Sequence, residues 1–178
     1  MEHNWTFKHG EFSFEPIKKT DLEWARNLHN DPEVVSMLTD PHEVTSEQQQ
    51  AWFKRLRNSN SSKYLIVRRD RERIGIIRLN PIDHANHNIM IGLDIHKEHR
   101  GKHYAKPIYR GLLDFCFNQL NMHRVHFKVA EYNARAFKLY RELGFKEEGR
   151  ERQSLHRFGK FHDYIVMGML KPEYNALK

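Results

Sequence analysis

The sequence predicts one α/β (α+β) domain, a mixed, mostly antiparallel central sheet of about six to seven strands flanked by about four to five helices. Three observations lead to this fold class. Residues 124–129 alternate in polarity as a half-buried strand does, residues 105–120 carry apolar side chains at helical spacing, and strands and helices intermix along the chain. The expected order is strand, helices, three antiparallel strands, helix, strand, helix and two strands. We find no linker or repeat, so residues 1–178 are expected to form a single domain.

The composition fits a folded domain with an anionic partner. The chain has 178 residues, 39% of them hydrophobic and 12% aromatic, which is enough to build a core. A net charge of +7 with 13 histidines favours a nucleotide, a nucleotide-linked substrate or nucleic acid as partner. The single cysteine, Cys116, excludes an internal disulfide and a CxxC zinc site. Without a long apolar run or a leader, we expect a soluble, cytoplasmic protein.

The N-terminal part predicts one strand and three helices. The alternation of Phe12, Ser13 and Phe14 indicates a strand within residues 5–17. Each helix has its own start signal. These signals are a Thr-x-x-Glu capping box at residues 20–23, Asp31 followed by proline, and Thr45 or Ser46 followed by glutamines.

The middle of the chain predicts three antiparallel strands and a long helix. Residues 64–67 and 74–79 form a hairpin around a charged turn, and residues 89–95 form the third strand. The helix starts near His103, because Pro107 is tolerated only near a first turn, and runs to about Leu120.

The C-terminal part predicts a strand, a helix and a closing hairpin. The strand covers residues 124–129, and Asn133 caps a helix that ends before Gly144. Residues 150–156 and 161–170 form the hairpin, with a turn at residues 158–160.

The turn between the third strand and the long helix is a candidate anion site. Its residues are Arg100, Gly101, Lys102, His103, Tyr104 and Ala105. The first N–H groups of a helix have no intrahelical partner and lie at the positive end of its dipole, so they bind phosphate. Arg100 and Lys102 are expected to add full positive charge. An ordinary solvated corner between a strand and a helix is the structural alternative.

Two motifs together resemble the GNAT superfamily of acetyl-CoA-dependent N-acetyltransferases. The first is the turn at residues 100–105, which is similar to the family's Arg/Gln-x-x-Gly-x-Gly/Ala. The second is the segment from Asn133 to Phe145, which resembles its Asn-x-x-Ala-x-x-x-Tyr-x-x-x-Gly-Phe. The tail at residues 147–150 and 159–163 resembles the branch of ribosomal-protein N-terminal and amino-sugar acetyltransferases. The resemblance spans residues 12–170 and implies a GNAT-like fold.

The resemblance also implies the roles of individual residues. Backbone groups of Ile95 and of the turn at residues 100–105 hold the pantetheine and pyrophosphate of acetyl-CoA. Asn133 contacts the pantetheine arm, and Tyr140 is the general acid for the departing sulfur. A phenol with a pKa of about 10 stays protonated at pH 7 and gives its proton readily to a thiolate whose conjugate pKa is about 8.5. The structural alternative for Tyr140 is a core aromatic.

The chain departs from the family pattern at two positions. His103 stands where the turn usually has glycine; we expect its ring to face solvent and the His103→Gly variant to bind acetyl-CoA equally well or better. Met90 stands where many relatives carry a glutamate base. The remaining candidate bases are Asp94, Glu131 and two loop histidines, His84 and His87.

Without a strong base, the site favours an acceptor amine of low pKa. Neutralising an alkyl amine of pKa about 10.4 at pH 7 costs about 4.6 kcal/mol, against about 1–1.4 kcal/mol for an α-amine. We therefore expect an amino sugar, free or nucleotide-linked, or a protein N-terminal amine, with a polyamine or aminoglycoside as the alternative. A non-catalytic CoA-binding protein or a basic nucleic-acid-binding module is the alternative of another class. We expect no metal, although the spacing of His96, His99 and His103 resembles that of metal ligands. We expect a monomer or homodimer.

Overall fold

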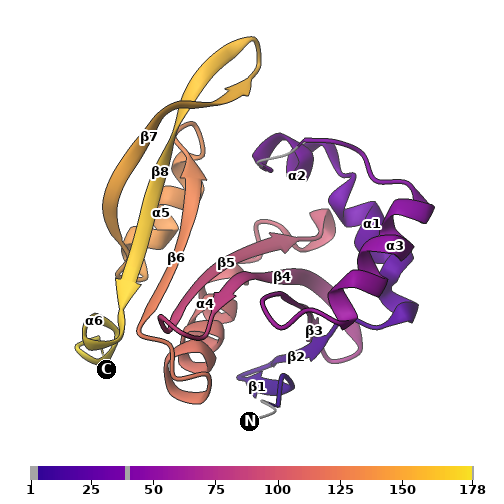
Figure 1. The fold of residues 1–178 in the computed structure, drawn as a ribbon, viewed down its shortest axis with the longest axis horizontal. Helices are drawn as coiled ribbons and strands as arrows, with labels where there is room; N and C mark the ends of the chain where they lie inside the picture. Colours follow the sequence, from indigo (N-terminus) through magenta and orange to yellow (C-terminus); the bar gives the residue numbers. More distant parts are fainter. Residues whose placement is uncertain (1–3, 39–40, 178) are drawn as a thin grey trace.

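The computed structural model describes residues 4–38 and 41–177, which form one eight-stranded sheet flanked by helices (Figure 1). The strand order is β1-β2-β3-β4-β5-β6-β8-β7. All neighbours are antiparallel except β5 and β6. The strands are β1 (Phe7–His9), β2 (Phe12–Pro16), β3 (Lys63–Arg69), β4 (Glu72–Asp83), β5 (Asn88–Ile95), β6 (Arg124–Ala130), β7 (Lys146–Arg157) and β8 (Lys160–Leu170). The mixed, mostly antiparallel sheet expected from the sequence is confirmed, with slightly more strands.

Helices cover the two faces of the sheet unequally (Figure 1). One face carries the larger core, to which α4 and α5 contribute, and the other carries a smaller core under α1, α2 and α3. Within the described residues the helices are α1 (Leu22–His29), α2 (Pro32–Met37), α3 (Ser46–Arg57), α4 (Ala105–Asp114), α5 (Ala134–Glu142) and α6 (Lys171–Asn175). None of the helices in this described part is long and apolar enough to cross a membrane.

Three of the predicted caps are confirmed. The Asp31 side chain accepts from the Glu33 N–H at the start of α2, Thr45 forms a capping box with Gln48 before α3, and Asn133 accepts from the Ala136 N–H before α5. The capping box predicted at residues 20–23 is wrong. Asp21 closes that turn instead, since its carboxylate accepts from the Lys18 N–H at 3.0 Å within a short 3₁₀ segment at Lys19–Asp21.

The long helix after the anion turn differs from its prediction at the C-terminal end. After α4 it widens into a π-helical turn at Phe115–Gln119, where the Leu120 N–H donates to the Phe115 carbonyl at 3.0 Å. Phe115, Cys116 and Phe117 are all buried. Three consecutive residues cannot share one face of a straight α-helix, so the wider turn brings all of them into the core.

The sheet divides into two halves between β5 and β6. These strands pair over three residues only, Asn88 to Met90 with Arg124 to His126. Beyond this point β5 continues along β4 and β6 continues along β8, so the two halves diverge (Figure 1). The divergence leaves a gap next to residues 91–95 of β5 and 127–130 of β6.

Candidate active site

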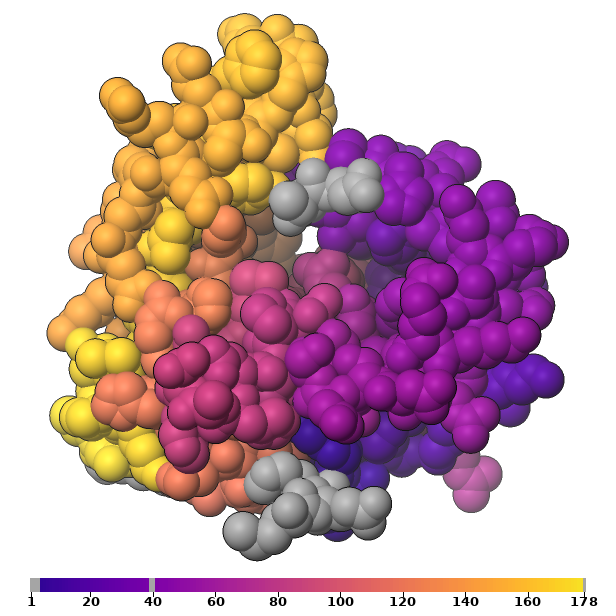
Figure 2. Space-filling view, in the orientation of Figure 1, coloured from indigo at the N-terminus to yellow at the C-terminus, as the bar shows by residue number. Residues whose placement is uncertain are grey.

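The gap between β5 and β6 offers unpaired backbone groups. The space-filling view shows the surface hollowed there, between the N-terminal helices and the arm of β6 and β8 (Figure 2). The His96 N–H donates to the Ile74 carbonyl on β4, so the alternation of an antiparallel strand turns the backbone groups of Leu93 and Ile95 toward the gap. A ligand with amide groups can pair with such an edge as an added strand does.

The turn at residues 100–105 presents free donors at the end of the same strand. Among the described residues, the backbone N–H groups of residues 101–106 have no hydrogen-bond acceptor. Gly101 and His103 have positive φ angles of 79° and 62°, which curl the backbone so that these groups are exposed. The turn therefore has the geometry of an anion site. His103 is exposed, and it occupies the left-handed conformation that glycine adopts without strain.

Arg100 does not supply the free positive charge that the sequence predicted. Its guanidinium donates to Asp31 at 3.2 Å, to Glu33 at 2.7 Å and to the Ile95 carbonyl at 3.0 Å. Two carboxylates of the α2 N-terminus therefore neutralise this side chain. Lys102 is exposed and has no partner among the described residues, so it is the free cation of the turn.

The other turn residues contribute mainly through their backbone. The Tyr104 hydroxyl accepts from Arg69 at 2.8 Å, and its ring packs edge-on against Phe12 at 5.4 Å. Its side chain therefore anchors the turn to the sheet. Ala105 begins α4 and is partly buried.

Helix α2 connects the two sides of the gap. Arg100 holds its first turn, as described above, and the loop between β6 and α5 holds its end. The Tyr132 hydroxyl donates to the Ser36 carbonyl oxygen at 2.7 Å, and Asn133 Nδ2 lies 3.5 Å from Met37 Sδ. The helix thus forms a wall across the mouth of the gap (Figure 1).

The side chain of Tyr140, on α5, packs against α4 and β6. Its ring lies 4.1 Å from that of Phe127, and its hydroxyl lies 3.2 Å from the hydroxyl of Tyr109 on α4. Burial raises the pKa of Tyr140, while the hydrogen bond with Tyr109 opposes this increase. At neutral pH the phenol therefore keeps its proton.

An ion pair lies on the opposite side of β5. Arg78 Nη1 and Asp94 Oδ2 are 3.1 Å apart on the sheet face that α1 to α3 cover. A Cβ at Gly92 would stand 2.8 Å from Arg78 Nη2, so the glycine makes room for the guanidinium. Burial has the largest effect on the pKa of Tyr140 and of His29; of the charges in this pair, Asp94 raises and Arg78 lowers each of these pKa values.

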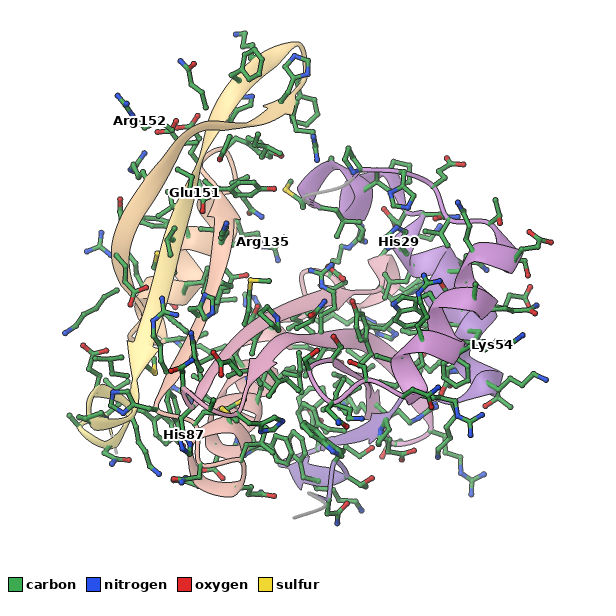
Figure 3. All side chains as sticks on the ribbon, in the orientation of Figure 1. His29, Lys54, His87, Arg135, Glu151 and Arg152 are labelled. Atoms are coloured by element: carbon green, nitrogen blue, oxygen red, sulfur yellow. The ribbon has the colours of Figure 1, made fainter. Side chains whose placement is uncertain are left out.

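The other candidate bases do not join this group. His84 contacts the Asn60 carbonyl and His87 the Asn121 carbonyl, both near the start of β5, far along the strand from Asp94. Figure 3 shows His87 at that end, whereas His29 and Arg135 lie on the two sides of the gap. The structure therefore excludes both histidines from the gap, because they belong to the turn before β5.

Glu131 also has other partners. Its carboxylate accepts from the Asp163 N–H at 3.1 Å and lies 3.3 Å from His162 and 3.9 Å from Arg150. These residues belong to the hairpin of β7 and β8. The carboxylate therefore ties the β6–α5 loop to this hairpin.

Sequence reasoning did not single out three side chains of the site, namely Arg78, Tyr109 and His126. His126 faces Met90 where β5 and β6 separate, and burial, with Arg124 and Lys128 nearby, lowers its pKa to about 4. Its imidazole is therefore neutral at pH 7. The sequence placed Tyr109 on the apolar face of the long helix and Arg78 within the predicted strand at residues 74–79, without a role for either side chain. Both gain their position from strand and helix packing that no local motif reveals.

The described residues include no group of three or more histidine, cysteine, aspartate or glutamate side chains that could hold a metal ion.

Comparison with known proteins identifies the family. The model of the acetyltransferase (GNAT) domain family matches residues 12–146, about three quarters of the chain. The chain belongs to the GNAT family. It is an acetyl-CoA-dependent N-acetyltransferase, and the donors at residues 101–106 and the free edge of β5 fit the pyrophosphate and the amides of this cosubstrate.

Several relatives cover most of the chain. The spermidine N(1)-acetyltransferase of Vibrio cholerae is 27% identical over 159 residues, 89% of this chain and 92% of that protein. The uncharacterized N-acetyltransferase p20 of Bacillus licheniformis is 31% identical over 166 residues, 89% of this chain and 93% of that protein.

Solved structures agree with the fold. The crystal structure of the Vibrio cholerae spermidine N-acetyltransferase in complex with CoA and spermine has a TM-score of 0.88 at 25% identity, covering 93% of this chain and 98% of that one. Another structure of that enzyme is described as dodecameric, so the expectation of a monomer or homodimer is not confirmed.

Proposed function

We propose that this N-acetyltransferase acetylates a primary amine of a polyamine. The observation that carries the proposal is the charge of residues 27–53, which contain five carboxylates and no lysine or arginine in a chain of net charge +7. These carboxylates are Asp31, Glu33, Asp40, Glu43 and Glu47, of which Asp40 lies outside the described residues. The segment includes the α2 wall of the gap, where Arg100 offsets one of the two negative charges of Asp31 and Glu33. Glu43 and Glu47 are exposed next to it, so a polycation meets a net acidic surface there.

The relatives support the same acceptor class. Those matched over most of the chain include spermidine N-acetyltransferases, whereas the sequence favoured an amino sugar or an N-terminal amine. That expectation considered only the cost of neutralising the amine. The charge of the surface that receives the acceptor is the stronger guide, because it decides which amines are concentrated at the site.

The cosubstrate half of the proposal uses backbone groups. The N–H groups of residues 101–106 bind the pyrophosphate, and the edge of β5 at Leu93 and Ile95 pairs with the pantetheine amides. The Ile95 carbonyl already accepts from Arg100, so its N–H is the free group. Asn133 Oδ1 is engaged as the α5 cap, and one N–H of its NH₂ group points to Met37 Sδ, which leaves the other N–H for the pantetheine.

The chemical half uses Tyr140 and Asp94. The neutral amine attacks the thioester carbonyl, the C–S bond breaks, and Tyr140 gives its proton to the sulfur. The amine nitrogen loses a proton to water, and Tyr140 regains one from water. Asp94 is the candidate that directs the proton of the ammonium form to water, because its ion pair with Arg78 uses Oδ2 and leaves Oδ1 for the acceptor, whereas Glu131 is tied to the β7–β8 hairpin.

The direct test is an assay of thiol release from acetyl-CoA with a panel of amines. We expect spermidine and spermine to have higher kcat/KM than nucleotide amino sugars, peptides with free N-termini and aminoglycosides. Their KM values should rise with ionic strength, because salt screens the acidic surface. An amino sugar with the highest kcat/KM would contradict the proposal.

We also propose that the whole chain acts as one acetyltransferase domain. The continuous sheet from β1 to β7 supports this, because each strand relies on a neighbour for its hydrogen bonds. Limited proteolysis should then yield no stable fragment shorter than the sheet. Light scattering in solution will give the number of chains in the assembly.

A further inference from the structure

Two tyrosine hydroxyls meet beneath the gap. Tyr109 on α4 is 2% exposed, and its hydroxyl lies 3.2 Å from that of Tyr140 on α5. The rings are 5.4 Å apart and nearly perpendicular, at 85°. Among the described residues, each hydroxyl has the other as its hydrogen-bond partner.

We propose that Tyr109 is a positioning residue that donates its hydrogen bond to the Tyr140 oxygen and so aims the Tyr140 proton at the leaving sulfur. The proposal deepens the proposed function and rests on Tyr140 as the general acid. It assigns a role to a residue that the sequence offered only as core.

The geometry allows only two arrangements of the hydrogens. One hydrogen can lie between the two oxygens, so either Tyr140 donates to Tyr109 or Tyr109 donates to Tyr140. In the first arrangement the Tyr140 proton points into the core. In the second arrangement the Tyr140 proton is free to point into the gap between β5 and β6. Once Tyr140 has lost its proton, only the second arrangement exists, so the hydrogen bond is strongest when the sulfur is being protonated.

The surroundings favour Tyr109 as the donor. Burial raises the pKa of Tyr109 well above that of an ordinary phenol, and its contact with Tyr140 raises it further. The same hydrogen bond lowers the pKa of Tyr140 against the effect of burial. Arg78 and Asp94 are the charged groups that act on both phenols, Arg78 lowering and Asp94 raising each pKa. Tyr140 is also the less buried of the two side chains, since it is only partly buried and Tyr109 is 2% exposed. A negative charge therefore costs less on Tyr140, which is the phenol that ionises first.

The proton balance of the step is simple. As the C–S bond breaks, its electron pair stays on sulfur and takes the Tyr140 proton. Tyr109 keeps its own proton and stabilises the Tyr140 phenolate by donating to it. Water then returns a proton to Tyr140, and the acetylated nitrogen has lost one proton to water.

The test compares Tyr109→Phe with two other variants. Tyr109→Phe should lower kcat about 10- to 100-fold, the factor that a hydrogen bond to a charged oxygen contributes, with the KM of acetyl-CoA changed less than about twofold. The alkaline limb of its kcat–pH profile should move to higher pH, because the Tyr140 phenolate loses its stabilising donor. In a Tyr140→Phe background, Tyr109→Phe should have no further effect on kcat.

Tyr174→Phe is the matched control. This buried tyrosine donates to Asp114 Oδ1 on the same helix, α4, at 2.9 Å. The Tyr174→Phe variant loses a buried hydroxyl, as Tyr109→Phe does, but it should keep the wild-type kcat and pH profile. Equal losses in the two variants would show a purely structural effect and overturn the proposal.

Other outcomes separate the two proposals. If Tyr140→Phe lowers kcat and Tyr109→Phe leaves kcat and the alkaline limb unchanged, the positioning role is wrong and the general acid stands. If Tyr140→Phe keeps full turnover, both roles are wrong. Wild-type thermal stability in Tyr109→Phe together with the shifted limb would support the positioning role.

Discussion

The side chain of Arg100 gives the sharpest test of the site, because sequence and structure assign it different partners. The sequence places it beside the pyrophosphate of acetyl-CoA. In the structure it holds the N-terminus of α2 through Asp31 and Glu33. Arg100→Ala removes these contacts and leaves the backbone of the turn intact.

The magnitude follows from the exposure of the two carboxylates. The Asp31 side chain is only 15% exposed, so losing its partner costs about 1.5 kcal/mol, whereas Glu33 at 78% exposed adds at most about 0.5 kcal/mol. A total of about 2 kcal/mol lowers the Tm of a chain of this size by about 4–8 °C. A loosened α2 wall should raise the KM of the acceptor about tenfold and that of acetyl-CoA less than threefold.

The measurements are thermal unfolding and two-substrate kinetics, with Lys102→Ala as the control. Lys102 has the same charge in the same turn and no partner among the described residues. Its loss should raise the KM of acetyl-CoA and leave the Tm unchanged. If Arg100→Ala behaves like Lys102→Ala, with an unchanged Tm and a raised acetyl-CoA KM, the guanidinium serves the pyrophosphate and our reasoning fails.

Three further changes probe the turn, the fold and the ion pair. His103→Gly should bind acetyl-CoA equally well or better in calorimetry, since glycine adopts the φ of 62° without strain. Asp21→Asn should lose about 3 kcal/mol in urea unfolding at pH 7, because Asp21 is 1% exposed and accepts from Arg68 and Arg73 at 2.8 Å each. Burial raises the pKa of Asp21, but its hydrogen bonds and the arginines lower it overall, so wild-type stability falls as pH drops below about 4 and the variant's curve is flatter. Gly92→Ala should lower acceptor kcat/KM about tenfold in the same kinetic assay, because the new Cβ displaces Arg78 from Asp94.

Each of these has a clear contrary result. A tenfold weaker binding of acetyl-CoA by His103→Gly would mean that the imidazole contacts the cosubstrate. An Asp21→Asn variant with the wild-type acid profile would remove that carboxylate from the pH dependence. Unchanged kinetics in Gly92→Ala would show that the position of Arg78 does not matter for the acceptor.

Most secondary structure could be predicted because its signals are local. Asp31, Thr45 and Asn133 cap helices in the structure as their positions in the sequence indicate, since a cap needs only its own next three residues. The alternation in β5 also proved regular: Asp94 lies on the face opposite to the buried Ile91, because the extra residue of the β4–β5 pair is on β4.

The site depends on contacts that are distant in the sequence, and these could not be predicted. Arg100 meets Glu33 across 67 positions, and Tyr109 meets Tyr140 across 31. The positive φ of His103 had only an indirect signal in the sequence, namely the glycine that the family's turn usually has at this position. The acidic stretch at residues 27–53 was visible in the sequence and would have indicated a cationic acceptor.

The three-residue pairing of β5 with β6 has a thermodynamic consequence. The halves of the sheet share few hydrogen bonds, so their mutual orientation is among the least protected features of the fold. A molecule of acetyl-CoA that pairs with the edge of β5 and reaches α5 contacts both halves and holds them in one orientation. At a hundred times its Kd, this ligand adds about 2.7 kcal/mol to the free energy of unfolding. Amide hydrogen exchange along Phe127 to Ala130 should slow most when it binds.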